Sequence, residues 1–149
     1  MVSRVIPVDP FDLVIFGGTG DLARRKILPG LFRRFLAGQM LPESQIIGAA
    51  RSDFDDEGYR DTVREAIGEF GGADAARTVE LEDFLKRVRY VAIDAKGEDG
   101  WKALAALVDQ KRINAFYFSV APSLFGDLAE RLHLHAIANK DSRIVVEKP

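Results

Sequence analysis

The sequence predicts an α/β fold built on a doubly wound, mostly parallel sheet. Apolar, β-rich runs alternate along the chain with segments of helical periodicity, which is the pattern of βαβ units. The β-rich runs are continuously apolar, as expected for strands covered on both faces. With 149 residues the chain is long enough to bury one core, so we expect residues 1–149 to form one domain.

Composition narrows the classes of function. The formal net charge is −2 and the pI is near 5.7, so no nucleic-acid partner is predicted. The sequence has no cysteine, which excludes disulfides, thiolate catalysis and cysteine-ligated metals, and we predict no metal site. No apolar run approaches the roughly 18 residues that span a bilayer. The N-terminus has no signal-peptide pattern, so we expect no membrane partner and a cytoplasmic location.

Five segments are predicted to be strands from their β-rich, apolar composition: Phe11–Phe16, Gln45–Ala50, Val88–Ile93, Ala115–Val120 and Arg143–Val146. Right-handed crossovers would place them in one sheet. Ligands of such sheets bind at the carboxyl ends of the strands. The residues that directly follow each strand are therefore the candidates for a functional site.

The first predicted helix carries an apolar stripe at helical spacing, formed by Leu28, Leu31, Phe32, Phe35 and Leu36. Pro29 suits the first turn of a helix and disrupts a helix interior. Two alternatives stay open: the helix begins near Pro29 after a short turn from Asp21, or one longer helix is kinked at Pro29. Further helices are predicted at residues 56–70, 78–84 and 101–108, and a last helix follows Ser123 as its N-cap.

A glycine-rich turn joins the first strand to the first helix. Residues 18–23, GTGDLA, fit the Rossmann-like pattern G-x-G-x-x-G/A in the form that ends in alanine. Glycine lets the backbone approach a pyrophosphate, and free N–H groups at a helix start favour an anion. Thr19 can add a hydroxyl donor. The alternative is a loop that only connects strand and helix. A P-loop is not indicated, because no Gly-Lys-Ser/Thr follows.

The end of the second strand indicates which dinucleotide binds. A site for NAD would place an acidic residue here to accept from the ribose 2′-hydroxyl. The strand is followed instead by Arg51, whose planar guanidinium suits a 2′-phosphate, and by Ser52, which can supply one more hydrogen bond. Asp53 favours NAD if it points inward. We predict NADP, with a solvated surface arginine as the alternative for Arg51.

The fourth and fifth strands lead to further candidates. The fourth runs into a tight turn at Ala121-Pro122, whose backbone and Tyr117 are candidates to line the nicotinamide side; a core strand followed by a capped helix explains these residues equally well. The fifth strand delivers Lys148, a candidate to bind an anionic substrate or simply a solvated lysine. The bond before Pro149 can be cis.

No general base is predicted within the chain. The only histidines are His133 and His135, and both fall in a helix away from the strand ends, as surface or packing residues. We see no paired carboxylates and no nucleophile with an adjacent base. We therefore assign no catalytic residue.

Four blocks of the sequence resemble, in order, the N-terminal part of glucose-6-phosphate dehydrogenase: GGTGDLARRKILPGLF, IIGAARSDF, FYFSVAPSLF and RIVVEKP. The resemblance runs from about Phe11 to Pro149. It implies an NADP-dependent oxidation of glucose 6-phosphate at C1 to 6-phosphogluconolactone, at the entry to the oxidative pentose phosphate pathway. It also implies that the full-length enzyme is a homo-oligomer.

The resemblance also implies roles for individual residues. Contacts around the pyrophosphate fall to Gly17, Gly18, Thr19, Gly20, Asp21 and Leu22. The resemblance assigns Arg51 to the 2′-phosphate and places Tyr117 and the Val120-Ala121-Pro122 turn near the cofactor. It assigns Lys148 to substrate binding, positioned by a cis bond before Pro149.

The sequence departs from this family in two ways. Ala121-Pro122 stands where the family often has two adjacent prolines. The family's Asp-His catalytic block and its β+α substrate domain have no counterpart, so the chain resembles the amino-terminal third of the enzyme. We expect it to bind NADP without turning over glucose 6-phosphate. Two alternatives remain: a non-catalytic NADP-binding redox sensor, and another two-domain NADP oxidoreductase acting on sugars.

Overall fold

A computed structural model describes residues 9–139 and 141–146 and contains one parallel sheet of five strands. The strands are β1 (Phe11–Phe16), β2 (Gln45–Ala50), β3 (Val88–Ala92), β4 (Ile113–Phe118) and β5 (Arg143–Val146). Their order across the sheet is β3-β2-β1-β4-β5. This is the predicted doubly wound arrangement, in which the chain starts at the centre and builds outward to each side.

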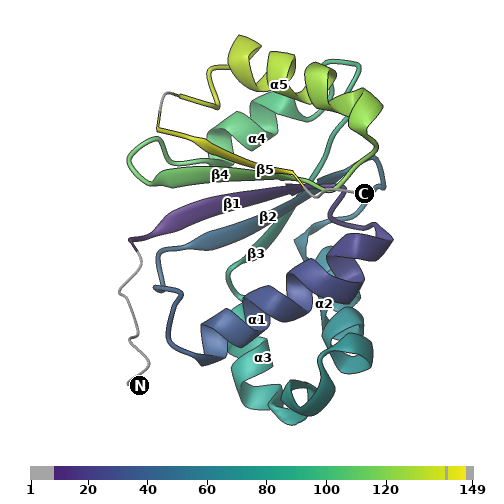
Figure 1. The fold of residues 1–149 in the computed structure, drawn as a ribbon, viewed down its shortest axis with the longest axis vertical. Coiled ribbons are helices and arrows are strands. Elements are labelled where there is room, and N and C mark those ends of the chain that lie inside the picture. The colour runs from purple at the N-terminus through teal and green to yellow at the C-terminus, as the bar shows by residue number, and fades with distance from the viewer. Residues whose placement is uncertain (1–8, 140, 147–149) are drawn as a thin grey trace.

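Helices cover both faces of the sheet. On one face lie α1 (Leu28–Leu36), α2 (Asp56–Phe70) and α3 (Thr78–Leu85), and on the other lie α4 (Trp101–Leu107) and α5 (Phe125–Leu134), as Figure 1 shows. None of the helices in the described part of the chain is long and apolar enough to cross a membrane.

Strand β1 divides its side chains between two cores. Leu13 and Ile15 point toward α1 to α3, while Val14 and Phe16 belong to the cluster around Trp101 of α4. Alternate residues of a strand point to opposite faces, so a strand covered on both faces must be apolar throughout. This explains the apolar run from Leu13 to Phe16, while Asp12 at the start of the strand is buried with partners: it accepts from the amide of Asp109 and pairs with Arg112.

The first helix is the longer, distorted alternative. Helical backbone runs from Asp21 to Leu36, and residues Ala23–Ile27 form a π-helical segment in which the amide of Leu28 donates to the carbonyl of Ala23. Pro29 follows this wide turn directly, and it has no amide N–H to give to a regular helix. The distortion therefore lies just before Pro29, and the helix itself starts at the glycine turn.

Two predicted boundaries were wrong. Strand β4 begins and ends two residues earlier than predicted, at Ile113 and Phe118. Ser123 does not cap α5: it lies inside a 3₁₀ turn (Pro122–Leu124), and no side chain caps the helix that follows. The amide of Leu124 donates instead to the carbonyl of Ala121 at 2.9 Å, so a backbone turn replaces the side-chain cap.

The sheet is covered unevenly. Strands β1 and β2 are buried on both faces, but β4 alternates between buried and half-buried residues, and every residue of β5 is exposed. On β5, Ile144, Val145 and Val146 are 50%, 42% and 44% exposed. The prediction that all strands are covered on both faces holds at the centre of the sheet and was wrong at this edge.

Candidate functional site

The glycine turn lies at the carboxyl end of β1, wedged between the ends of β2 and β4. Gly17 has φ +81°, a conformation that favours glycine, and a Cβ there would lie 2.1 Å from the carbonyl oxygen of Ser119. Its amide donates to the carbonyl of Ala49 at 2.8 Å. Gly17 is therefore required both for its conformation and for the close contact with β4.

Three of the amides in the glycine turn have a backbone acceptor, and one does not. Those of Gly17 and Gly18 donate to Ala49, and that of Gly20 donates to the Gly17 carbonyl at 2.9 Å. The amide of Thr19 donates to no acceptor among the described residues. The helix that begins at Asp21 has further amides in its first turn without helical acceptors, and its dipole favours an anion. The turn therefore offers donors to a phosphate group.

A pocket of about 250 Å³ opens beside this turn. It brings together five of the predicted residues: Gly17, Thr19, Arg51, Ser52 and Val120. The remaining lining residues are Phe16, Ala49, Ala50, Ile93, Ala95, Leu124 and Leu128. Most of them end or follow β1, β2, β3 and β4, where a doubly wound sheet is expected to bind its ligand.

Arg51 is the one ionisable residue that lines this pocket among residues 9–139 and 141–146. It is exposed and forms no ion pair with any described carboxylate. A side chain from β3 anchors the backbone on either side of Arg51. The hydroxyl of Tyr90 donates to the carbonyls of Ala50 at 3.1 Å and Ser52 at 2.5 Å. Asp53 is exposed and does not line the pocket. A free guanidinium on an anchored loop suits a phosphate ligand.

Four other predicted residues, all from the first block, lie near the pocket without lining it. Gly18 and Gly20 form the turn itself, and Leu22 follows it. The carboxylate of Asp21 accepts from Nε of Arg25 at 2.7 Å, so this side chain is engaged within its own helix. These residues support the turn, and Asp21 does not present a free carboxylate to the pocket.

The remaining predicted residues are more dispersed. Ala121 and Pro122 are exposed in the turn after β4, next to Val120. Tyr117 faces the other side of β4 and lines a separate groove, described below. Lys148 and the bond before Pro149 lie outside the described residues.

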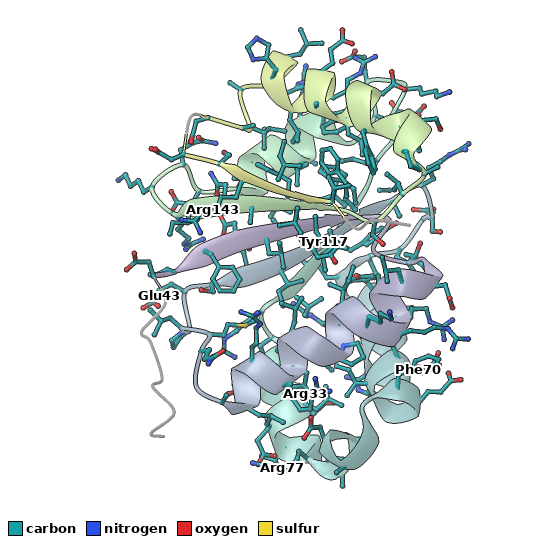
Figure 2. The ribbon with its side chains drawn as sticks, in the orientation of Figure 1. Arg33, Glu43, Phe70, Arg77, Tyr117 and Arg143 are labelled. Carbon is teal, nitrogen blue, oxygen red and sulfur yellow. The ribbon has the colours of Figure 1, made fainter. Side chains whose placement is uncertain are left out.

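The separate groove has a volume of about 540 Å³ and lies between α1 and the face of β1, β4 and β5. Its floor is apolar, with Leu13, Leu31 and Val145, and its cations are Lys26, Arg34 and Arg143. In Figure 2, Arg143 marks the end at which β5 begins, and Tyr117 lies nearer the carboxyl ends. The groove is larger than the pocket, but it does not include the glycine turn.

The histidines are engaged elsewhere. The ring of His135 stacks on Trp101 with centroids 6.0 Å apart, and its Nε2 lies 3.3 Å from a carboxylate oxygen of Glu98. His133 is exposed on α5. Neither lines the pocket, which agrees with the prediction that both are surface or packing residues.

Sequence reasoning missed Tyr59 and Gly48. The side chain of Tyr59 is fully buried, and its hydroxyl donates to the carbonyl of Gly18 at 2.9 Å. Burial raises the pKa of Tyr59, so the hydroxyl stays protonated as a donor. In the sequence Tyr59 is part of the apolar stripe of a helix, and no pattern distinguishes it from a packing residue.

The family model and two curated relatives that match this chain are all named as glucose-6-phosphate dehydrogenases. Residues 14–149 match the family described as "Glucose-6-phosphate dehydrogenase, NAD binding domain". Among curated relatives, the glucose-6-phosphate 1-dehydrogenases of Rhizobium meliloti and Gluconobacter oxydans are 43% and 41% identical, over 100% and 95% of this chain. The chain spans 31% and 30% of the lengths of these two relatives.

Solved structures agree. Glucose-6-phosphate 1-dehydrogenase from Mycobacterium avium matches 95% of this chain with a TM-score of 0.84 and 29% identity. A glucose-6-phosphate dehydrogenase in complex with its substrate glucose-6-phosphate matches 98% with a TM-score of 0.80 and 28% identity. The chain covers 30% and 32% of these two structures. This chain therefore belongs to the family of glucose-6-phosphate dehydrogenase NAD-binding domains.

Proposed function

We propose that this chain binds NADP in the pocket beside the glycine turn. In the whole protein it would be the cofactor-binding part of an enzyme that oxidises glucose 6-phosphate at C1 to 6-phosphogluconolactone. The names of the relatives support this assignment. The observation that carries the choice of cofactor is Arg51, an unpaired cation at the rim of a pocket whose other side is the glycine turn.

The residues of the chain divide the work of binding. The Thr19 amide and the first amides of the helix donate to the pyrophosphate, and the Thr19 hydroxyl can add another bond. Arg51 and Ser52 bind the 2′-phosphate. The apolar lining, with Ile93, Leu124 and Leu128, excludes water from the body of the ligand. NADP, when bound, supplies the acceptor for the hydride.

Other assignments remain part of the proposal. We place the Val120–Ala121–Pro122 turn toward the nicotinamide, and Lys148 at the substrate. Tyr117 lines the groove on the other face of β4, so we do not place it at this pocket. We further propose that the whole enzyme is a cytoplasmic homo-oligomer. No carboxylate or imidazole of the described residues lines the pocket, so we propose that the general base that takes the proton from the sugar hydroxyl comes from outside these residues.

Calorimetric titration of the chain with NADP and with NAD tests the proposal. We expect NADP to bind about tenfold or more tightly than NAD, because only NADP gives Arg51 a phosphate partner and such a charged hydrogen bond is worth roughly 1.5–3 kcal/mol. If neither dinucleotide binds, or if NAD binds more tightly than NADP, the proposal is wrong.

A further inference from the structure

The hydroxyl of Tyr59 joins two elements that are distant in the sequence. Tyr59 lies in the first half of α2, 41 residues after Gly18, and its phenol reaches the carbonyl of Gly18 beneath the glycine turn. The side chain is 0% exposed, so this hydrogen bond is shielded from water. A buried hydroxyl without a partner would be costly, which makes the bond to Gly18 a strong restraint on both groups.

Two glycines make room for this phenol. A Cβ on Gly48 would lie 2.3 Å from Cζ and 2.6 Å from the hydroxyl of Tyr59, and a Cβ on Gly18 would lie 2.8 Å from the same hydroxyl. Neither glycine has a positive φ. These positions are therefore glycines for space rather than for conformation, and the space they leave is filled by Tyr59.

The hydrogen bond fixes the orientation of one peptide group. The Gly18 carbonyl and the Thr19 amide belong to the same planar trans peptide, so they point in opposite directions. Tyr59 holds the carbonyl toward the core, which turns the Thr19 N–H away from the core. Thr19 lines the pocket, and its amide has no acceptor among the described residues.

We propose that Tyr59 is a positioning residue for the pyrophosphate, acting through the Gly18–Thr19 peptide. Its hydroxyl holds the Gly18 carbonyl, and the Thr19 amide is thereby presented to the ligand in advance. Donors that are already oriented bind an anion without the cost of reorganisation. This inference rests on the proposed function, because it requires that the pocket take a dinucleotide.

The test compares two ligands in two tyrosine variants. NADP has both a pyrophosphate and a 2′-phosphate, whereas adenosine 2′-monophosphate has only the latter. Tyr59→Phe keeps the ring and removes the hydroxyl. We expect the Kd of NADP to rise about tenfold and that of adenosine 2′-monophosphate to change less than about twofold, as for the loss of one charged hydrogen bond.

Tyr90→Phe is the matched control. The rings of Tyr90 and Tyr59 lie 5.0 Å apart, but the Tyr90 hydroxyl holds Ala50 and Ser52 rather than the glycine turn. Removing this hydroxyl frees the loop proposed to bind the 2′-phosphate, and both ligands carry that phosphate. We therefore expect Tyr90→Phe to weaken both ligands by the same factor and to leave the ratio of their affinities unchanged.

A spectroscopic measurement separates positioning from a merely structural role. In the wild type, inorganic pyrophosphate should shift the NMR resonance of the Thr19 amide proton downfield. In Tyr59→Phe the Gly18 carbonyl carbon should move upfield without ligand, and the response of Thr19 to pyrophosphate should shrink. This readout needs no dinucleotide and is interpretable even where the variant is less stable.

The outcomes are distinguishable. A wild type that binds neither dinucleotide overturns the proposed function and this inference with it. The wild type can instead bind NADP while Tyr59→Phe leaves both affinities unchanged, or weakens the binding of NADP and of adenosine 2′-monophosphate by the same factor. Either result overturns the role of Tyr59 alone. An unchanged Thr19 response to pyrophosphate in the variant does the same.

Discussion

At the scale of single residues, the proposed selectivity for NADP depends on Arg51. Most arginines of this protein are paired, as Arg64 is with Glu82 and Arg77 with Glu80. Arg51 has no such partner in the described part of the chain and lines a pocket. An exposed ion pair contributes little to stability, so leaving one arginine unpaired costs the fold almost nothing and keeps its charge available for a ligand.

Arg51→Ala should therefore weaken the binding of NADP much more than the binding of NAD. We expect the Kd of NADP to rise about tenfold or more and that of NAD to change less than about twofold, measured by titration calorimetry. Arg77→Ala is the control, because Arg77 lies in the lower helix layer, remote from the glycine turn (Figure 2), and should change neither value. Equal losses for both dinucleotides would remove the 2′-phosphate role of Arg51.

The sequence was informative about residues whose chemistry depends on local spacing. Gly17, Thr19, Arg51 and Ser52 follow strand ends, and the pocket contains all four. Tyr59 could not be predicted in the same way. Its role depends on a contact across 41 residues, and on a helix with an apolar stripe a tyrosine has the same pattern as any packing residue.

At the scale of elements, the packing of α2 against β2 depends on Gly48. A methyl group there would clash with the side chain of Tyr59, 2.3 Å from Cζ and 2.6 Å from the hydroxyl oxygen. Gly48→Ala should lower the free energy of unfolding by about 1–3 kcal/mol, as overpacking does, when measured by urea denaturation. Relief of the clash would have to displace the Tyr59 hydroxyl from Gly18.

Gly68 provides the contrasting case. It lies exposed in the last turn of α2, and a Cβ built on it would meet no heavy atom within 4 Å apart from its chain neighbours and the backbone of its own helix. Gly68→Ala should raise the free energy of unfolding by about 0.5–1 kcal/mol, because alanine loses less conformational entropy in a helix. If the two substitutions had the same sign, close packing at Gly48 would not be the cause.

The aromatic cluster between α2 and β3 should make the fold sensitive to alkaline pH. Burial, helped by the nearby Asp53, raises the pKa of Tyr90 to about 12, and burial also raises the pKa of Tyr59. An unfolded tyrosine has a pKa of about 10. The folded protein thus holds these protons more tightly, so this contribution is fully present below about pH 10 and is lost as pH rises toward 12 and beyond.

Urea denaturation at a series of alkaline pH values checks this sign. The free energy of unfolding should fall above about pH 10, and Tyr90→Phe should make that fall less steep. Lysines also titrate in this range, so the informative quantity is the difference between wild type and variant. A fall of equal steepness in both would exclude the contribution of Tyr90.

The elements were predicted best where periodicity is the main signal. The stripe of α2 gave the correct bounds, Asp56–Phe70, because an amphipathic helix repeats its pattern over several turns. Strand β4 was misplaced because the apolar run continues past its end. Its ladder stops at Phe118, whose partner on β1 is Phe16, since β1 itself ends where Gly17 turns. The length of a strand depends on the strand it pairs with, so it cannot be predicted from the strand's own residues alone.

At the scale of the whole molecule, the two edges of the sheet differ. Strands β1 and β2 are buried, whereas β5 at one edge is exposed along its whole length. Helices α1 to α3 gather over β1, β2 and β3 (Figure 1). The apolar groove described above lies beside β4 and β5. The doubly wound parallel sheet was predicted from the alternation of strands and helices, and the structure supplies the order of its strands. The exposure of β5 did not follow from its residues, because an apolar strand has the same composition whether it lies inside a sheet or at its edge.

The pocket proposed for the dinucleotide has no carboxylate or imidazole among its described lining residues, and this sets the last prediction. Oxidation of a sugar hydroxyl needs a base within hydrogen-bonding reach of that hydroxyl. Among the described residues, Arg51 is the one ionisable residue that lines the pocket, and its guanidinium has hydrogen-bond donors but no acceptor; His135 contacts Trp101 and Glu98 instead. The chain mixed with NADP and glucose 6-phosphate should therefore form no NADPH, measured by absorbance in the near ultraviolet. A full-length relative in the same assay shows that the conditions permit turnover. NADPH formed in proportion to the concentration of this chain would mean that a base from outside the pocket reaches the sugar, and it would contradict the division between a binding part and a catalytic part.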